Sequence, residues 1–175
     1  MSRLNGKHVA FLLTDGYEDS ELTQPWEALT EAGAKVTLIA PQGGEVEGKK
    51  GFQAPVDLTS AEVDAKDYDA LMLPGGVVNA DHLRMDQPSV AFTRAFFDAD
   101  KPVGVICHGG WILTDADVVR DRTITSYPSL KTDLVNAGAT WVDEEVVVDG
   151  KLVSSRTPAD LPAFNEKLIE AVDRG

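Results

Sequence analysis

The stretch Pro102-Val103-Gly104-Val105-Ile106-Cys107-His108-Gly109-Gly110 joins a short apolar run to an abrupt polar end. Its first five residues are typical of a buried strand, and the paired glycines allow a close backbone approach where a helix begins. A sharp strand-to-helix turn of this kind presents one side chain at the top of a sheet. We therefore predict a strand over 102–106, Cys107 at its carboxyl end, and a helix that runs to about Leu113.

Short strand-like runs alternate with longer helical patterns along the rest of the chain, which is typical of βαβ units around a parallel sheet. Further strands are predicted at 7–13, 35–40, 69–73, 145–148 and 152–154, with a small hairpin within 41–60. Helices are predicted from Glu18 or Ser20 to Ala32, and at 88–98, 130–137 and 160–173. This pattern predicts one α/β domain over residues 1–175. Its fold would be flavodoxin-like: a doubly wound, mostly parallel sheet with helices on both faces, in a three-layer sandwich.

In open sheets of this type, functional sites lie beyond the carboxyl ends of the strands, where the strand order reverses. The rule selects three loops before any chemistry is considered. They are residues 14–19, 74–82 and 107–110.

The charge and composition argue against several classes of function. Acids outnumber bases 29 to 16, for a net charge of −13, whereas nucleic-acid binders gather Lys and Arg. No apolar run is long enough to cross a membrane, and the start of the chain lacks the apolar stretch of a signal peptide. We expect a cytoplasmic protein with neither a membrane partner nor a specific nucleic-acid partner.

Cys107 is the only cysteine, so the chain cannot form an intramolecular disulfide, which fits a reducing compartment. The three histidines are scattered, no ligand spacing indicates a metal, and we expect neither a metal nor another cofactor. Beside a helix N-terminus the thiolate is favoured over the thiol, so Cys107 is the candidate nucleophile. The alternative is a buried structural cysteine.

Neighbouring residues offer the groups that a nucleophile needs. His108 is a candidate base if the turn brings its imidazole to the same side as the sulfur; otherwise it is a hydrogen-bonding turn residue. The backbone amide of His108 is expected to form an oxyanion hole with Gly75 and Gly76, although a plain turn is an equal reading of the two glycines.

Three acids stand at the start of the helix predicted after the first strand. Glu18 is ambiguous, because its carboxyl group would face Cys107 or would only complement the helix dipole. For Asp19 and Glu21 we favour the second interpretation, that of ordinary acids in the first turn of a helix.

Taken together, these residues resemble the PfpI family of intracellular cysteine proteases and general stress proteins. That family belongs to a superfamily with the protein deglycases and the class I glutamine amidotransferase-like domains. The segments that carry the resemblance keep a specific order and spacing over nearly the whole chain. They are residues 15–19, 48–51, 69–76, 106–109, 125–128, 136–139, 145–149 and 154–161.

The resemblance implies a role for several residues. Cys107 is the nucleophile, Glu18 is a carboxyl group held against its sulfur, and His108 is the base in hydrolytic members. The acid that orients this histidine comes from a neighbouring subunit, which implies a homodimer or a higher homo-oligomer. Its match here is Asp81, one methylene shorter than the Glu of protease-type members.

Further matches surround this constellation. The resemblance implies that Tyr127 and Gly109 line the site. The chain departs from the family pattern at Gly110, where the family usually has Pro.

Three functions follow from this reading. The first is a stress-associated cysteine hydrolase that acts on small carbonyl adducts, like the family's deglycase and glyoxalase-like members. The second is peptide hydrolysis by the same residues. The third is a redox-responsive protein without turnover, whose thiolate is oxidised reversibly to sulfenic acid. Its partners are expected to be a small-molecule or peptide substrate and other copies of the chain.

Overall fold

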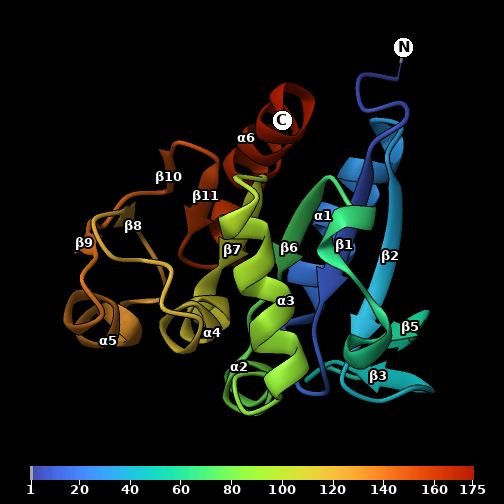
Figure 1. Cartoon of the computed structure of the whole chain (residues 1–175), viewed down its shortest axis with the longest axis horizontal. Helices are drawn as coiled ribbons and strands as arrows, with labels where there is room; N and C mark the ends of the chain where they lie inside the picture. Colours follow the sequence, from blue (N-terminus) through green and yellow to red (C-terminus); the bar gives the residue numbers. More distant parts are fainter. Residues whose placement is uncertain (1) are drawn as a thin grey trace.

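The computed structural model describes residues 2–175 and is built on one large, mostly parallel sheet. The strand order is β10-β11-β7-β6-β1-β2-β5, and only β10 pairs antiparallel with its neighbour (Figure 1). The strands are β1 (His8–Leu12), β2 (Lys35–Ala40), β5 (Leu58–Thr59), β6 (Ala70–Leu73), β7 (Val103–Ile106), β10 (Val146–Asp149) and β11 (Leu152–Ser155). This arrangement confirms the predicted flavodoxin-like α/β fold.

The central strands are buried on both faces, because helices cover each side of the sheet. In β1, Val9 and Phe11 point into one core, whereas Ala10 and Leu12 point into the other. On the first face lie α1 (Asp19–Glu31) and α6 (Leu161–Arg174). On the second lie α3 (Gln87–Asp98), α4 (Trp111–Asp115) and α5 (Lys131–Asn136), and Figure 1 shows α3 passing in front of the sheet.

Some short elements differ from the sequence prediction. The predicted hairpin is confirmed as β3 (Glu45–Glu47) and β4 (Gln53–Pro55), which form a separate two-stranded sheet. Residues expected to be part of a loop form α2 (Val77–Leu83), and β8 (Thr123–Ile124) pairs with β9 (Thr140–Trp141). These elements were missed because two to seven residues are too few to establish a period.

Short 3₁₀ segments complete the chain. They are η1 (Ser60–Glu62), η2 (Ala65–Asp67), η3 (Cys107–Gly110), η4 (Pro128–Leu130) and η5 (Pro158–Asp160). The helix expected directly after Cys107 therefore begins as η3 and continues as α4. Over residues 2–175, no helix combines the length and apolar character needed to cross a bilayer.

The strand order reverses at β1, which has β2 on one side and β6 on the other. The loops after β1 and β6 therefore meet above the sheet, and the amide of Glu18 donates to the Gly75 carbonyl at 3.1 Å. Gly76 has φ +99°, and a Cβ there would lie 2.4 Å from the Gly16 carbonyl oxygen. Only glycine allows this approach, which brings the candidate loops together.

The adjacent glycines of η3 have opposite surroundings, which gives a matched test of the packing. A Cβ on Gly109 would lie 2.7 Å from the Leu73 carbonyl oxygen, whereas the nearest atom to a Cβ on Gly110 is 3.6 Å away. Gly110 also has helical backbone angles. We expect Gly109→Ala to lower the free energy of unfolding by about 2 kcal/mol. Gly110→Ala should raise it by about 0.5 kcal/mol.

Urea unfolding midpoints of the two variants and the wild type measure this difference. Equal destabilisation by both substitutions would contradict the described packing of η3 against the end of β6.

Candidate active site

Cys107 stands at the carboxyl end of β7 in a strained backbone conformation. Its φ is +61°, which is rare for a residue with a side chain, and it begins η3 directly after the strand. The residue is 9 % exposed. Strain of this kind occurs where the surrounding structure fixes a functional group, so the geometry is that of a nucleophile elbow.

His108 lies on the same side of the turn as the sulfur. Its Nδ1 is 3.2 Å from Cys107 Sγ, and its Nε2 is 3.3 Å from Ser129 Oγ. The ring stacks on Tyr127 with centroids 4.6 Å apart, which places Tyr127 at the site. Burial and the charge of Lys49 lower the pKa of His108. A neutral imidazole beside a thiol can act as a base.

The carboxyl group nearest to the sulfur belongs to Glu21, which corrects the position that we predicted for Glu18. Glu21 is fully buried, and its Oε1 accepts a hydrogen bond from the Gly75 amide at 2.8 Å. Its carboxyl also interacts with the Cys107 thiol, although Oε2 has no well-formed hydrogen bond within residues 2–175. Glu18 instead lies 2.5 Å from Lys49 Nζ and 3.4 Å from Lys50 Nζ.

A signal for Glu21 is present in the sequence. Glu21 belongs to the buried stripe of α1, together with Leu22, Pro25 and Leu29. An acid within the apolar stripe of an amphipathic helix is not an ordinary first-turn acid, because burial of its charge needs compensation. Glu18, the N-cap residue, lies outside the helix and meets the lysines of the β3–β4 hairpin.

Glu21 and Cys107 are buried next to each other, and the pKa values of both groups are raised. Burial raises the pKa of Glu21 to about 8. Burial, together with the charge of Glu21, raises the pKa of Cys107 to about 12, against the opposing effect of the Gly76 and His108 amides. We expected the helix start to favour the thiolate, but burial and the charge of Glu21 have the larger effect on the pKa of Cys107. The two acids titrate as one unit, whose first proton leaves near pH 8.

The predicted oxyanion hole is only partly free. The Gly75 amide donates to Glu21, so it is not available to a substrate oxygen. The amides of Gly76 and His108 both face the sulfur, where they stabilise negative charge. Gly109, which we expected to line the site, faces the Leu73 and Pro74 carbonyls and packs the turn instead.

Asp81 is exposed on α2, and no hydrogen bond joins it to His108 within the described chain. Two residues earlier, Asn79 is fully buried and ties the loops together. Its Oδ1 accepts from the Thr14 amide at 2.7 Å, and its Nδ2 donates to the Pro74 and Gly75 carbonyls. Sequence reasoning missed this positioning residue because α2 was not predicted.

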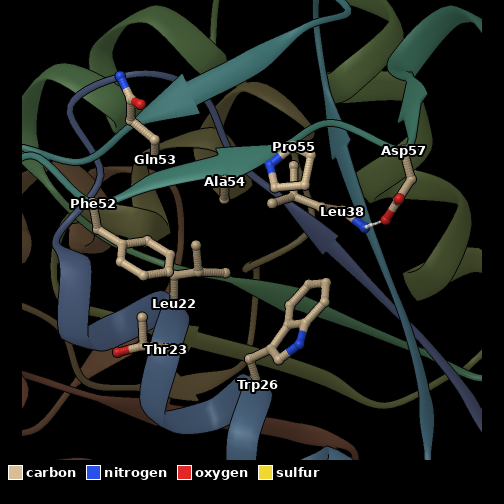
Figure 2. Close-up of a pocket in the computed structure, with 9 residues that line it drawn as sticks. All are labelled: Leu22, Thr23, Trp26, Leu38, Phe52, Gln53, Ala54, Pro55 and Asp57. Atoms are coloured by element: carbon tan, nitrogen blue, oxygen red, sulfur yellow. Dashed lines mark hydrogen bonds between the residues drawn. The ribbon is translucent and has the colours of Figure 1, made fainter.

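Residues 2–175 contain no group of three or more His, Cys, Asp or Glu side chains arranged to hold a metal ion. An apolar pocket of about 450 Å³ lies between α1, β2 and β4. Figure 2 shows Leu22, Trp26 and Phe52 at this pocket. None of the residues that line it belongs to the Cys107 site.

Comparison with known proteins places this geometry in a family. Residues 7–171 match the model of the DJ-1/PfpI family. The chain is 47 % identical to protein/nucleic acid deglycase 2 of Escherichia coli, over 93 % of this chain and 96 % of the relative. It is 44 % identical to general stress protein 18 of Bacillus subtilis, over 97 % and 99 %.

Among solved structures, DJ-1beta of Drosophila melanogaster is similar, with a TM-score of 0.88 and 30 % identity over 97 % of this chain and 91 % of that one. The sequence matches and the structural match each cover more than nine tenths of this chain and of the similar protein. The chain belongs to the DJ-1/PfpI family.

Proposed function

We propose that this protein is a stress-associated cysteine hydrolase that acts on small carbonyl adducts, in the manner of a deglycase. The observation that carries the proposal is the buried contact of the Glu21 carboxyl with the Cys107 thiol, whose sulfur also lies 3.2 Å from His108 Nδ1. At neutral pH the site therefore holds an acid, a base and a nucleophile in one place. The names of the deglycase and stress-protein relatives support the same reading.

The addition step uses each group once. Cys107 Sγ bonds to the aldehyde carbon of a 2-oxoaldehyde while His108 Nδ1 takes the thiol proton. Glu21 gives its proton to the carbonyl oxygen, and a hemithioacetal forms. With a glycated amine, the same sulfur displaces the amine from the hemiaminal carbon, and the amine leaves with the proton that Glu21 gives up.

The remaining steps regenerate the site. The Glu21 carboxylate moves a proton from the first carbon to the second, and the hydroxyl proton on the first carbon moves to the oxygen of the second, so that the hemithioacetal becomes a thioester. Water then cleaves the carbon–sulfur bond and releases a 2-hydroxy acid. The sulfur regains its proton from His108, and the new acid returns a proton to Glu21.

Peptide hydrolysis receives less support from this chain. A cysteine peptidase needs an acid that orients the histidine, and Nε2 of His108 instead faces the hydroxyl of Ser129. Asp81 would have to come from a second copy of the chain.

A second proposal is that α2 lies at a homodimer interface. Val77 and Val78 on α2, beside η3, are 51 % and 50 % exposed, and an exposed apolar pair of this kind supports a contact between two copies.

The two glutamates give a matched test of the mechanism. Glu21→Gln keeps an acceptor for the Gly75 amide but removes the proton relay, so turnover of methylglyoxal should fall by about 10²-fold. Glu18→Gln, which alters only the pair with the lysines, should lower it by less than about tenfold. Lactate production, with Cys107→Ala as the blank, measures both. A large loss in Glu18→Gln with near wild-type turnover in Glu21→Gln would overturn the assignment.

The homodimer proposal is tested by light scattering at micromolar concentration, where we expect a dimer. Val77→Glu should shift the protein toward monomer, because it places a charge in the apolar contact. Val148→Glu is the control, since Val148 is equally exposed at 51 % but lies on the edge strand β10. A wild-type monomer, or dissociation by Val148→Glu alone, would refute an interface at α2.

A further inference from the structure

The tip of the β3–β4 hairpin carries two lysines to the edge of the active site. Lys49 Nζ and Lys50 Nζ both lie against the Glu18 carboxylate, at 2.5 and 3.4 Å. The side chain of Glu18 is 7 % exposed, whereas those of Lys49 and Lys50 are 53 % and 70 % exposed. The two ammonium groups thus remain open to solvent above a carboxylate that has only one charge.

The hairpin tip does not depend on these lysine side chains alone for its position. The Asp19 carboxylate accepts hydrogen bonds from the amides of Lys50 and Phe52, each at 3.0 Å. The amide of Lys49 donates to the Tyr17 carbonyl at 2.9 Å, and Tyr17 Oη donates to the Phe52 carbonyl at 2.6 Å. These backbone contacts hold the tip in addition to the salt bridges of Lys49 and Lys50 to Glu18.

Glu18, which pairs with the lysines of the tip, belongs to the loop that packs beside Cys107. The amide of Glu18 bonds to the Gly75 carbonyl, and a Cβ on Gly75 would lie 2.7 Å from Cys107 Cβ. The positive charge of Lys49 acts on Cys107, Glu21 and His108. A group bound by Lys49 is thus within electrostatic reach of all three reacting side chains.

The exposed charges at the hairpin tip are the two ammonium groups. At neutral pH Glu21 keeps its proton and His108 is neutral, because burial shifts both pKa values in that direction. The carboxylates of Glu18 and Asp19 balance Lys49 and Lys50, but Glu18 is buried and Asp19 accepts hydrogen bonds from the amides of the tip. An incoming ligand therefore meets the ammonium groups first, and these attract anions.

We infer that Lys49 and Lys50 form a carboxylate-recognition site, and that the preferred substrates are small 2-oxoaldehydes which carry a carboxylate. The carboxylate binds the two ammonium groups in exchange for part of their contact with Glu18, and the aldehyde carbon faces Cys107. Lys49 and Lys50 thereby determine specificity for the proposed reaction, on which the substrate assignment rests.

The first experiment needs no turnover. Iodoacetate and iodoacetamide alkylate the same thiolate with loss of iodide and differ in charge, so the ratio of their rates cancels any change in the thiolate fraction. In the double variant Lys49→Gln/Lys50→Gln, the iodoacetate-to-iodoacetamide ratio should fall at least about fivefold. The control is Lys66→Gln, because Lys66 pairs with Asp64 on an exposed surface. Its ratio should equal that of the wild type.

The second experiment compares kcat/KM for 4,5-dioxopentanoate, which would yield 2-hydroxyglutarate, with kcat/KM for neutral methylglyoxal. We expect the wild type to favour the anion, and the double variant to lose about tenfold of that preference through a higher KM. An unchanged alkylation ratio, or equal use of both substrates, would overturn carboxylate recognition and leave the proposed hydrolase intact. If neither compound is turned over, the hydrolase proposal fails, and the alkylation ratio alone decides whether the lysines select anions.

Discussion

The site depends on one constraint, which is that a carboxyl group and a thiol are buried against each other with little room for two charges. Glu21 enters from α1 and Cys107 from the end of β7, and the Gly75 amide holds the carboxyl in place. Burial disfavours ionisation of both groups, so the pair keeps a proton that an exposed glutamate would have lost. The acid step of the proposed mechanism needs that retained proton at neutral pH.

The fold supplies this contact through the reversal of its strand order. The loops after β1, β6 and β7 meet because these strands are neighbours in the sheet. Gly76 allows the first two loops to touch, and Asn79 bonds to both of them. The hairpin then adds its lysines from outside. Three loops and one hairpin thus contribute to the site, although none of them carries a complete site.

The sequence alone predicts the sheet and the position of Cys107 at the end of a strand, because alternating apolar runs and an abrupt strand end are local patterns. The sequence did not predict which glutamate contacts the Cys107 sulfur, because Glu18 and Glu21 are only three residues apart at the start of one helix. Which of them reaches the sulfur depends on where α1 begins and how the Gly75 loop packs on it. Those are tertiary facts, and only the place of Glu21 within an apolar stripe hinted at them.

The central claim is that Glu21 holds a proton at neutral pH because of its burial beside Cys107. A carbon-13 NMR titration of the Glu21 side-chain carboxyl, assigned with Glu21→Gln, tests it most directly. The account predicts a midpoint near the pKa of about 8 and a change of that midpoint in Cys107→Ala. A midpoint near 4.5, the ordinary value for a glutamate, with no response to the loss of the thiol, would contradict it.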